Sequence, residues 1–522
     1  MSVTDTTKKA ADTADTHITH ADGRSVAKNL VLVTVAIAQL MVVLDATIVN
    51  VALGSISESL HVRSQADLSW IVTAYTLTFG GFLLLGGKIA DRIGRRTVFA
   101  SGATLFAIAS LLGGVAQSLG LLIAARGLQG MGAALMSPAA LSLLTVVFRE
   151  GKERDRALGI WAGITAGGAA LGLILGGLLT EYATWRLVFL VNVPIAILAV
   201  VGAFRFVPES KDERAQAFDV PGAVLITGSL MSLVYALVKG NDNGWSSGST
   251  LATLGLGLVL LAAFVAVQRS SQAPLIPTRV LKIRTVLGAD IGALLIGAGI
   301  FAIFFFVILW MEQVNGWSPV KSGFAFLPMP FTIGISAGIG AKLLGKIGPR
   351  PLLLFGPMLA STGLLQLGLR LQPDSTYAGT ILPALLCVAG GMGMTFVSLT
   401  SSAVAGVPHA DAGIASALLN AGQQVGGAMG LAILTAVSTS RSSSLLDGFH
   451  AKTEAVKQAF AVGTPNVRLT AQVNDALVSG WATGFLVGAA FLISAAVVAG
   501  SMVKVSKADA EKALHDGAAV AG

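Results

Sequence analysis

The chain has 522 residues, of which 54% are hydrophobic and 12% charged. Soluble proteins carry about 25% charged residues because their surfaces face water, so this composition argues against soluble enzymes and nucleic-acid binders. A single cysteine, Cys387, excludes an intramolecular disulfide. The net charge of +8 fits the excess of Lys and Arg found in the cytoplasmic loops of membrane proteins. We therefore expect an all-α polytopic membrane protein.

Fourteen apolar runs follow a polar tail over residues 1–28 that we expect to be disordered. A helix needs about 20 apolar residues to cross the hydrocarbon of a bilayer. The predicted spans are 29–53, 69–87, 97–116, 120–147, 157–180, 187–204, 220–238, 250–267, 286–311, 322–341, 351–369, 379–406, 413–437 and 479–502. A second polar tail, 503–522, follows the last span.

One predicted loop is unusually long and polar. It covers residues 438–478, between the last two spans, and we expect it to be extracellular. Its residues 453–460 suit a short amphipathic helix. The loop is equally compatible with a lid over an outer vestibule and with a tolerated surface insertion.

The distribution of positive charge predicts the orientation of the spans. Lys and Arg accumulate on the cytoplasmic side of a membrane protein, and an even number of spans places both termini on the same side. With both tails in the cytoplasm, the inside segments hold 25 of the 35 Lys and Arg residues and the outside loops hold 9. We therefore expect both termini in the cytoplasm.

Two loops of similar sequence indicate an internal repeat. The loop over 88–96, after the second span, matches the loop over 342–350, after the tenth, at five positions with one constant offset. This predicts two six-helix bundles, over 29–206 and 286–502, with spans seven and eight (220–267) inserted between them as a hairpin. Repeated halves are typical of secondary transporters, whose substrate site lies near the bilayer midplane.

Two charged residues lie deep inside apolar spans. Asp45 is about 12 Å from the outer end of the first span, and Arg126 is about 10 Å from the outer end of the fourth. A charge near the bilayer centre costs on the order of 3 kcal/mol or more, so each needs a partner or a cavity. A carboxylate that is neutral with a proton, or charged beside a cation, can exchange protons for cations. We expect these two residues to couple protons to transport; a packing role for Asp45 and a carbonyl-binding role for Arg126 are the alternatives.

Four segments resemble motifs of the major facilitator superfamily. Residues 87–96 resemble its cytoplasmic loop motif, and 126–130 followed by Pro138 resemble its intramembrane arginine motif. Residues 44–53 are similar to the first-helix signature of its fourteen-helix drug:proton antiporter branch, the EmrB/QacA type, and 163–177 resemble the antiporter motif. The resemblance implies the major facilitator fold, with two six-helix bundles and two inserted helices.

The resemblance implies roles for two sets of residues. The first set, at the cytoplasmic end of the second span, is expected to latch the inside gate: Gly87, Asp91, Arg92, Gly94, Arg95 and Arg96. The repeat has Gly345 where Asp91 stands, so we expect the latch to be asymmetric. The second set, in the fifth span, is associated in this family with sealing against proton leak: Gly163, Gly167, Gly168, Gly172, Gly176 and Gly177.

The spacing of the glycines in the fifth span permits close helix contact. Gly168, Gly172 and Gly176 share one helix face, and simple packing explains this spacing as well as a sealing role does. The family usually has a proline after the position of Gly172, where this chain has Leu173. This chain keeps the glycines that permit close packing. It lacks the proline, so a bend that depends on this proline is not expected from the sequence.

A substrate pocket is predicted from aromatic and amide side chains. Aromatic faces attract lipophilic cations, and amides offer adaptable hydrogen bonds. The tentative pocket consists of Asn50, Gln129, Phe301, Phe305, Asn420 and Gln424. Contact with lipid is the alternative for any one phenylalanine.

Two further carboxylates lie in the ninth span. We interpret Asp290 as a helix-end charge near Arg284, with a second proton or cation site as the alternative. Glu312, at the outer end of the same span, is expected to lie at the membrane interface.

These features predict a secondary transporter rather than an enzyme. We expect export of hydrophobic, cationic drugs or toxic compounds in exchange for protons, with a dedicated exporter of one endogenous metabolite or antibiotic as the alternative. The chain has no Gly-x-x-x-x-Gly-Lys-Ser/Thr loop for ATP, so the proton gradient would supply the energy. We expect a monomer in the plasma membrane, with small molecules, protons and lipid as partners and with no cofactor, metal site or nucleic acid.

Overall fold

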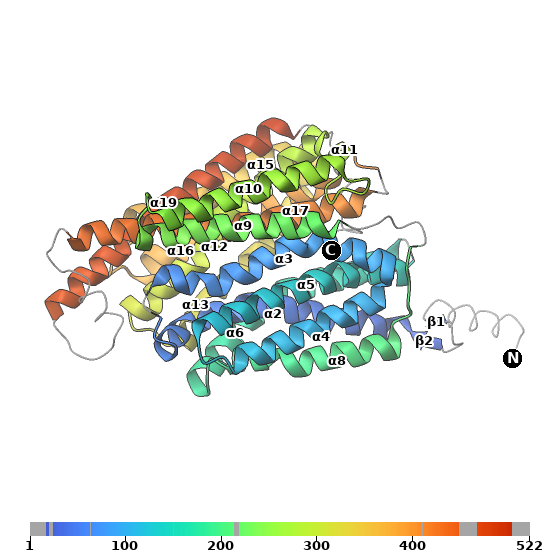
Figure 1. Ribbon diagram of the computed structural model, residues 1–522, viewed down its shortest axis with the longest axis horizontal. Coiled ribbons are helices and arrows are strands. Elements are labelled where there is room, and N and C mark those ends of the chain that lie inside the picture. The colour runs from blue at the N-terminus through green and yellow to red at the C-terminus, as the bar shows by residue number, and fades with distance from the viewer. Residues whose placement is uncertain are drawn as a thin grey trace, which may run out of the picture.

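The computed structural model is a bundle of long helices (Figure 1). It describes residues 17–19, 25–62, 64–149, 151–212, 219–408, 411–447 and 467–503. The N-terminal half contains α2 (Lys28–Ser59), α3 (Gln65–Ile93), α4 (Arg95–Gly114), α5 (Leu119–Val147), α6 (Lys152–Tyr182), α7 (Leu187–Leu190) and α8 (Asn192–Phe206). A connecting part follows, with α9 (Val220–Asn243), α10 (Gly248–Ser270) and α11 (Thr278–Leu281).

The C-terminal half repeats the pattern of long helices, with two short π-helical segments. Its elements are α12 (Arg284–Leu309), η1 (Trp310–Val314), α13 (Pro319–Phe326), α14 (Pro328–Ile347), α15 (Pro349–Arg370), η2 (Tyr377–Ile381), α16 (Leu382–Val404), α17 (Ala412–Asp447) and α19 (Val467–Met502). The end of the bundle that contains the α2–α3 loop is called the α2–α3 end. The opposite end, which contains the α3–α4 loop, is called the α3–α4 end.

The helices confirm an all-α membrane architecture. In the described part of the chain, thirteen helical segments are long and apolar enough to cross a membrane, and they coincide with thirteen of the predicted spans. The remaining prediction, 413–437, lies in α17, a helix of 36 residues that packs on α3, α12 and α19. Contact with these helices, and with α9, leaves α17 less lipid to face, which suits its amides at Asn420, Gln423 and Gln424.

The two halves meet along two pairs of helices, α3 with α17 and α6 with α13. Both contacts depend on glycine. A Cβ atom at Gly80 of α3 would lie 3.2 Å from the carbonyl oxygen of Ala421. A Cβ atom at Gly177 of α6 would lie 2.8 Å from the carbonyl oxygen of Pro319. The missing side chains let the helix backbones approach closely, as is typical of helix contacts in membranes.

The segment inserted between the halves forms a helical hairpin. α9 and α10 pack on each other, and α9 also packs on α3 and α17, so the hairpin covers the junction of the two halves (Figure 1). Lys239 of α9 forms an ion pair of 2.7 Å with Asp67 of α3. The rings of Trp70 and Tyr235 lie 6.2 Å apart at the same contact.

The repeated loops have the same construction in both halves. α3 is followed by Gly94 with a φ of 135°, and α14 is followed by Gly348 with a φ of 76°. This left-handed region favours glycine. In each loop the next helix starts at the following residue, Arg95 or Pro349. The two loops therefore share one backbone construction.

Two predicted boundaries differ from the structure. The predicted tail contains two short strands, β1 (His17–Thr19) and β2 (Ser25–Ala27), which pair antiparallel. The predicted loop over 438–478 is shorter, because α17 continues to Asp447 and α19 begins at Val467. Both helices extend past the others at the end of the bundle opposite β1 and β2 (Figure 1). Hydropathy does not detect such polar extensions, and the predicted helix over 453–460 lies outside the described residues.

A buried hydrogen bond between the halves gives a stability prediction. The Trp481 indole N–H donates to the Gln65 side-chain oxygen over 3.0 Å. Gln65→Leu leaves this N–H unpaired, which should destabilise the protein by about 1–3 kcal/mol. Thermal unfolding in detergent measures the loss, with Gln117→Leu as the control because Gln117 is exposed near the same end. Equal melting temperatures for the two variants would contradict this role.

Candidate functional site

A buried ion pair lies in the middle of the N-terminal half. Nη1 of Arg126, on α5, lies 2.5 Å from Oδ2 of Asp45, on α2. The side chains are 1% and 0% exposed. The two charged residues, which the sequence places at a similar depth in the bilayer, are therefore in direct contact. Each charge neutralises the other where neither reaches water.

Amide side chains complete the coordination of the carboxylate. Gln129 of α5 donates to Oδ1 of Asp45 over 3.0 Å, and Asn192 of α8 donates to the same oxygen over 2.9 Å. Gln129 also donates to the Ser110 hydroxyl of α4 over 2.8 Å. These three residues are fully buried. Both oxygens of the carboxylate are therefore occupied by donors, which stabilises its charged form.

The guanidinium of Arg126 has partners on a further helix. Its Nε donates to the carbonyl oxygen of Ile71 over 2.8 Å. Its Nη1 also donates to Gln129 over 3.0 Å, and its central carbon lies 4.3 Å from the centre of the Tyr75 ring. Charge, hydrogen bonds and a cation–π contact hold one cation at the junction of α2, α3 and α5. The carbonyl-binding role and the ion pair therefore occur together.

Sequence reasoning missed part of this cluster. Gln129, a predicted pocket residue, bridges Asp45 and Arg126. Asn192 and Ser110 were not singled out. Asn192 is a single amide and Ser110 a single hydroxyl within apolar spans. The sequence does not indicate the helix face on which either side chain lies, so it gives only a weak signal for both.

The predicted antiporter-motif glycines divide into three groups. Cβ atoms at Gly168, Gly172 and Gly176 would meet Leu40, Thr47 and Ile48 of α2, so this helix face packs on the segment of α2 that carries Asp45. Gly177 faces α13. Cβ atoms at Gly163 and Gly167 would meet nothing within 4 Å. Gly163 and Gly167 therefore lie outside the α2–α6 contact.

The predicted gate residues bind a segment of their own half. Arg95, the first residue of α4, pairs over 2.8 Å with Asp91, near the end of α3. Arg96 lies 3.6 Å from the Glu209 carboxylate, which also accepts the backbone N–H groups of Arg96 and Thr97 over 3.1 and 3.2 Å. Glu209 follows α8 and supplies a negative charge at the start of α4, where the helix dipole favours it.

The other gate residues lie around this contact. A Cβ atom at Gly94 would lie 2.6 Å from the Glu209 carboxylate, so the loop requires glycine for space as well as for its φ. Gly87 and Arg92 lie in the last two turns of α3. Lys88 donates to the carbonyl oxygen of Pro274 over 2.5 Å. In this structure the loop thus contacts the segments on either side of the inserted hairpin.

The predicted pocket residues lie on four helices, α2, α5, α12 and α17. Phe305 is fully buried in the core beside Phe306, and the Phe301 ring lies against Gly427 of α17. The amides of Asn50 and Asn420 donate to carbonyl oxygens of their own helices, over 3.0 and 3.1 Å. Gln424 lies at the α3–α17 contact, opposite Gly80.

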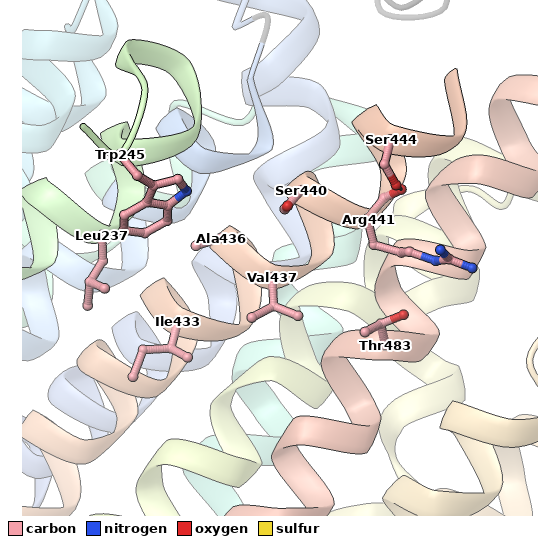
Figure 2. A pocket seen from close by; sticks show the side chains of 9 residues that line it. All are labelled: Leu237, Trp245, Ile433, Ala436, Val437, Ser440, Arg441, Ser444 and Thr483. Carbon is pink, nitrogen blue, oxygen red and sulfur yellow. The ribbon is translucent and has the colours of Figure 1, made fainter. Parts of the chain in front are cut away.

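A pocket of about 440 Å³ lies elsewhere, at the α2–α3 end of α17 (Figure 2). Its walls come from α9, the α9–α10 turn, α17 and α19, and Figure 2 shows Trp245 and Arg441 on opposite sides of Val437. Its lining residues are Leu237, Trp245, Ile433, Ala436, Val437, Ser440, Arg441, Ser444 and Thr483. This set contains no carboxylate and none of the predicted pocket residues.

The two carboxylates of the ninth span lie in different surroundings. Asp290 is 9% exposed, and neither of its carboxylate oxygens has a hydrogen-bond partner among the described residues. Its interpretation as a helix-end charge near Arg284 is therefore wrong, because the α12 turn that carries it is enclosed by other helices. Glu312 lies in η1 against α2, where a Cβ atom at Gly54 would contact its carboxylate.

Comparison with known proteins identifies the family. A family model described as the Major Facilitator Superfamily matches residues 35–431. The chain belongs to the major facilitator superfamily. The superfamily resemblance seen in the motifs is therefore confirmed, and the described helices form a multi-pass membrane protein of this family.

The most similar relatives include proteins named for resistance or export. The puromycin resistance protein of Streptomyces alboniger is 41% identical over 447 residues, which cover 83% of this chain and 88% of that protein. The cephamycin export protein of Amycolatopsis lactamdurans is 39% identical and covers 79% and 85%. The multidrug resistance protein Stp of Mycobacterium tuberculosis is 32% identical and covers 80% and 77%.

Solved structures confirm the major facilitator fold. A bacterial homolog of the human lysosomal transporter Spinster, in an inward-facing and occupied conformation, aligns with a TM-score of 0.64 at 16% identity over 92% of this chain and 98% of that chain. The xylose transporter XylE of E. coli, partially occluded and inward open, aligns with a TM-score of 0.54 at 13% identity over 89% and 97%.

The division of the glycine motif gives a testable difference between two variants. A Cβ atom at Gly176 would lie 2.8 Å from the backbone oxygen of Ile48, whereas Gly163 has open space. Gly176→Val should force α6 away from α2 and destabilise the protein by about 1–3 kcal/mol. Gly163→Val is the matched control on the same helix. Thermal unfolding of the two variants in detergent measures the difference, and equal losses would refute the assigned packing face.

Proposed function

We propose that this protein exports hydrophobic, cationic small molecules from the cell in exchange for protons, as a member of the fourteen-helix drug:proton antiporter branch. The names of its relatives, which refer to puromycin, cephamycin and multidrug resistance, support an export role. The buried Asp45–Arg126 pair carries the proposal of proton coupling. The protein would lie in the plasma membrane with both termini in the cytoplasm, as the loop charges favour.

The ion pair supplies a two-state switch. Arg126 keeps its proton, so Asp45 is neutralised either by the guanidinium or by a proton of its own. In this conformation the guanidinium and two amide donors occupy the carboxylate. A movement of α5 or α8 relative to α2 would remove these donors and leave a buried charge, which a proton would neutralise. Proton binding and helix movement are thereby coupled.

The contacts between the halves suit alternating access. In the proposed orientation the α2–α3 end faces the outside. At that end Gly177 packs on Pro319, and the backbone N–H of Val320 donates to Glu181 over 2.9 Å. Trp481 and Gln65 add a buried hydrogen bond. These contacts would close the outer side in the present conformation and separate when the halves rock.

A dedicated exporter of one antibiotic is the second candidate. The puromycin and cephamycin relatives are named for single compounds and are 41% and 39% identical to this chain. The resistance profile of cells that express the protein separates the two candidates. Protection against chemically unrelated dyes and antiseptics indicates multidrug export, and protection against one compound indicates a dedicated exporter.

Proton coupling is tested in proteoliposomes with ethidium as the probe. An imposed pH gradient should drive ethidium transport, and transport should collapse the gradient faster than leakage alone. Asp45→Asn and Arg126→Lys should each abolish gradient-driven transport, since the first removes the proton site and the second removes the planar guanidinium. Asp374→Asn is the control, because Asp374 is exposed in a loop. Full activity in both site variants would contradict the proposed switch.

A further inference from the structure

A second buried carboxylate, in the C-terminal half, has no partner. Asp290 lies on α12 with nine-tenths of its surface buried. Neither oxygen of its carboxylate accepts or donates a hydrogen bond among the described residues. This is the opposite of Asp45, whose two oxygens accept three side-chain donors. The two acids thus lie in contrasting environments, one in each half.

Uncharged segments of three helices enclose the α12 turn around Asp290. A Cβ atom at Gly422 of α17 would lie 3.4 Å from the backbone oxygen of Asp290. Two residues further along α12, a Cβ atom at Gly292 would contact Ala499 of α19 and Leu399 of α16. None of these contacts brings a charged side chain to this turn of α12. An ionised carboxylate here would lack both hydration and a cation.

The charged groups of the surrounding elements are either paired, exposed or distant along the bundle. Arg279 of α11 pairs with Asp411 over 2.7 Å, Lys28 of α2 pairs with Glu153 over 2.7 Å, and Arg284 at the start of α12 is exposed. Asp45 is held by Arg126. The only titratable group of α16 is the thiol of Cys387. At the opposite, α2–α3 end lie Glu58, Glu312, Arg441, Asp447 and Asp475.

The cost of an unpaired buried charge decides the state of Asp290. A carboxylate without a partner in an apolar environment takes up a proton rather than remain charged. We propose that Asp290 is a proton-binding site of the C-terminal half, and that it carries its proton in this conformation while Asp45 is ionised. The transport role of this site rests on the proposed function; the bound proton itself does not.

The position of Asp290 gives the direction of proton release. It lies six residues after the start of α12, about 9 Å from the α3–α4 end at 1.5 Å per residue. When the packing around this turn of α12 opens, water from that end reaches the carboxyl group. The O–H bond then breaks, the proton leaves to water, and the carboxylate keeps the electron pair. In the proposed orientation this release occurs on the cytoplasmic side, as import of a proton requires.

Infrared spectroscopy of the purified protein at neutral pH tests the bound proton without any substrate. A protonated carboxyl group has its own C=O stretching band, which a carboxylate lacks. The difference spectrum of wild type minus Asp290→Asn should contain this band, and that of wild type minus Asp45→Asn should not. Asp290→Glu should shift the band and retain it. Absence of the band from the Asp290 difference spectrum would overturn the proposal.

A transport measurement then separates this inference from the proposed function. If the protein exchanges ethidium for protons, Asp290→Asn should abolish transport driven by the pH gradient, and Asp290→Glu should restore it. Wild-type transport rates in Asp290→Asn would overturn the role of Asp290 in coupling, even with the band present. If wild type itself shows no gradient-driven transport, the proposed function fails, while the infrared band still decides the bound proton. An unchanged melting temperature of Asp290→Asn verifies its fold.

Discussion

A buried carboxylate must be neutralised, and this constraint organises the N-terminal half. Asp45 has no access to water, so its charge is held by Arg126 and by the amides of Gln129 and Asn192. Those partners come from α5 and α8, and Arg126 also binds the backbone of α3. One charge thus fixes the relative positions of four helices. Any movement of these helices changes the electrostatic balance of the site, which is what an ion-coupled transporter needs.

The helices around this charge pack without bulky side chains. Gly168, Gly172 and Gly176 place α6 directly on the part of α2 that carries Asp45. Gly80 and Gly177 do the same between the two halves. Such contacts bring the helix backbones close together because no side chain stands between them. The charge cluster and the glycine contacts therefore act on the same segment of α2.

The sequence predicted the architecture well because hydropathy and loop similarity depend on local residues. The sequence also places Asp45 and Arg126 at a similar depth in the bilayer, which permits a contact between them without specifying it. Helix rotation was not predictable in this way. It decides that Asp290 is enclosed while Arg284 is exposed, that Gln129 faces Asp45, and that Gly176 is packed while Gly163 is open. The role of Glu209 depends on a contact between segments more than 100 residues apart, which no local pattern contains.

The central claim is that Asp45 and Arg126 stabilise each other as a charged pair. A double-mutant cycle on the free energy of unfolding in detergent measures this most directly. Arg126→Leu alone should cost about 3–5 kcal/mol, because it strands the Asp45 charge in an apolar interior. Asp45→Asn added to Arg126→Leu should recover part of that loss. If the two losses simply add, the residues do not interact and the account of the site is wrong.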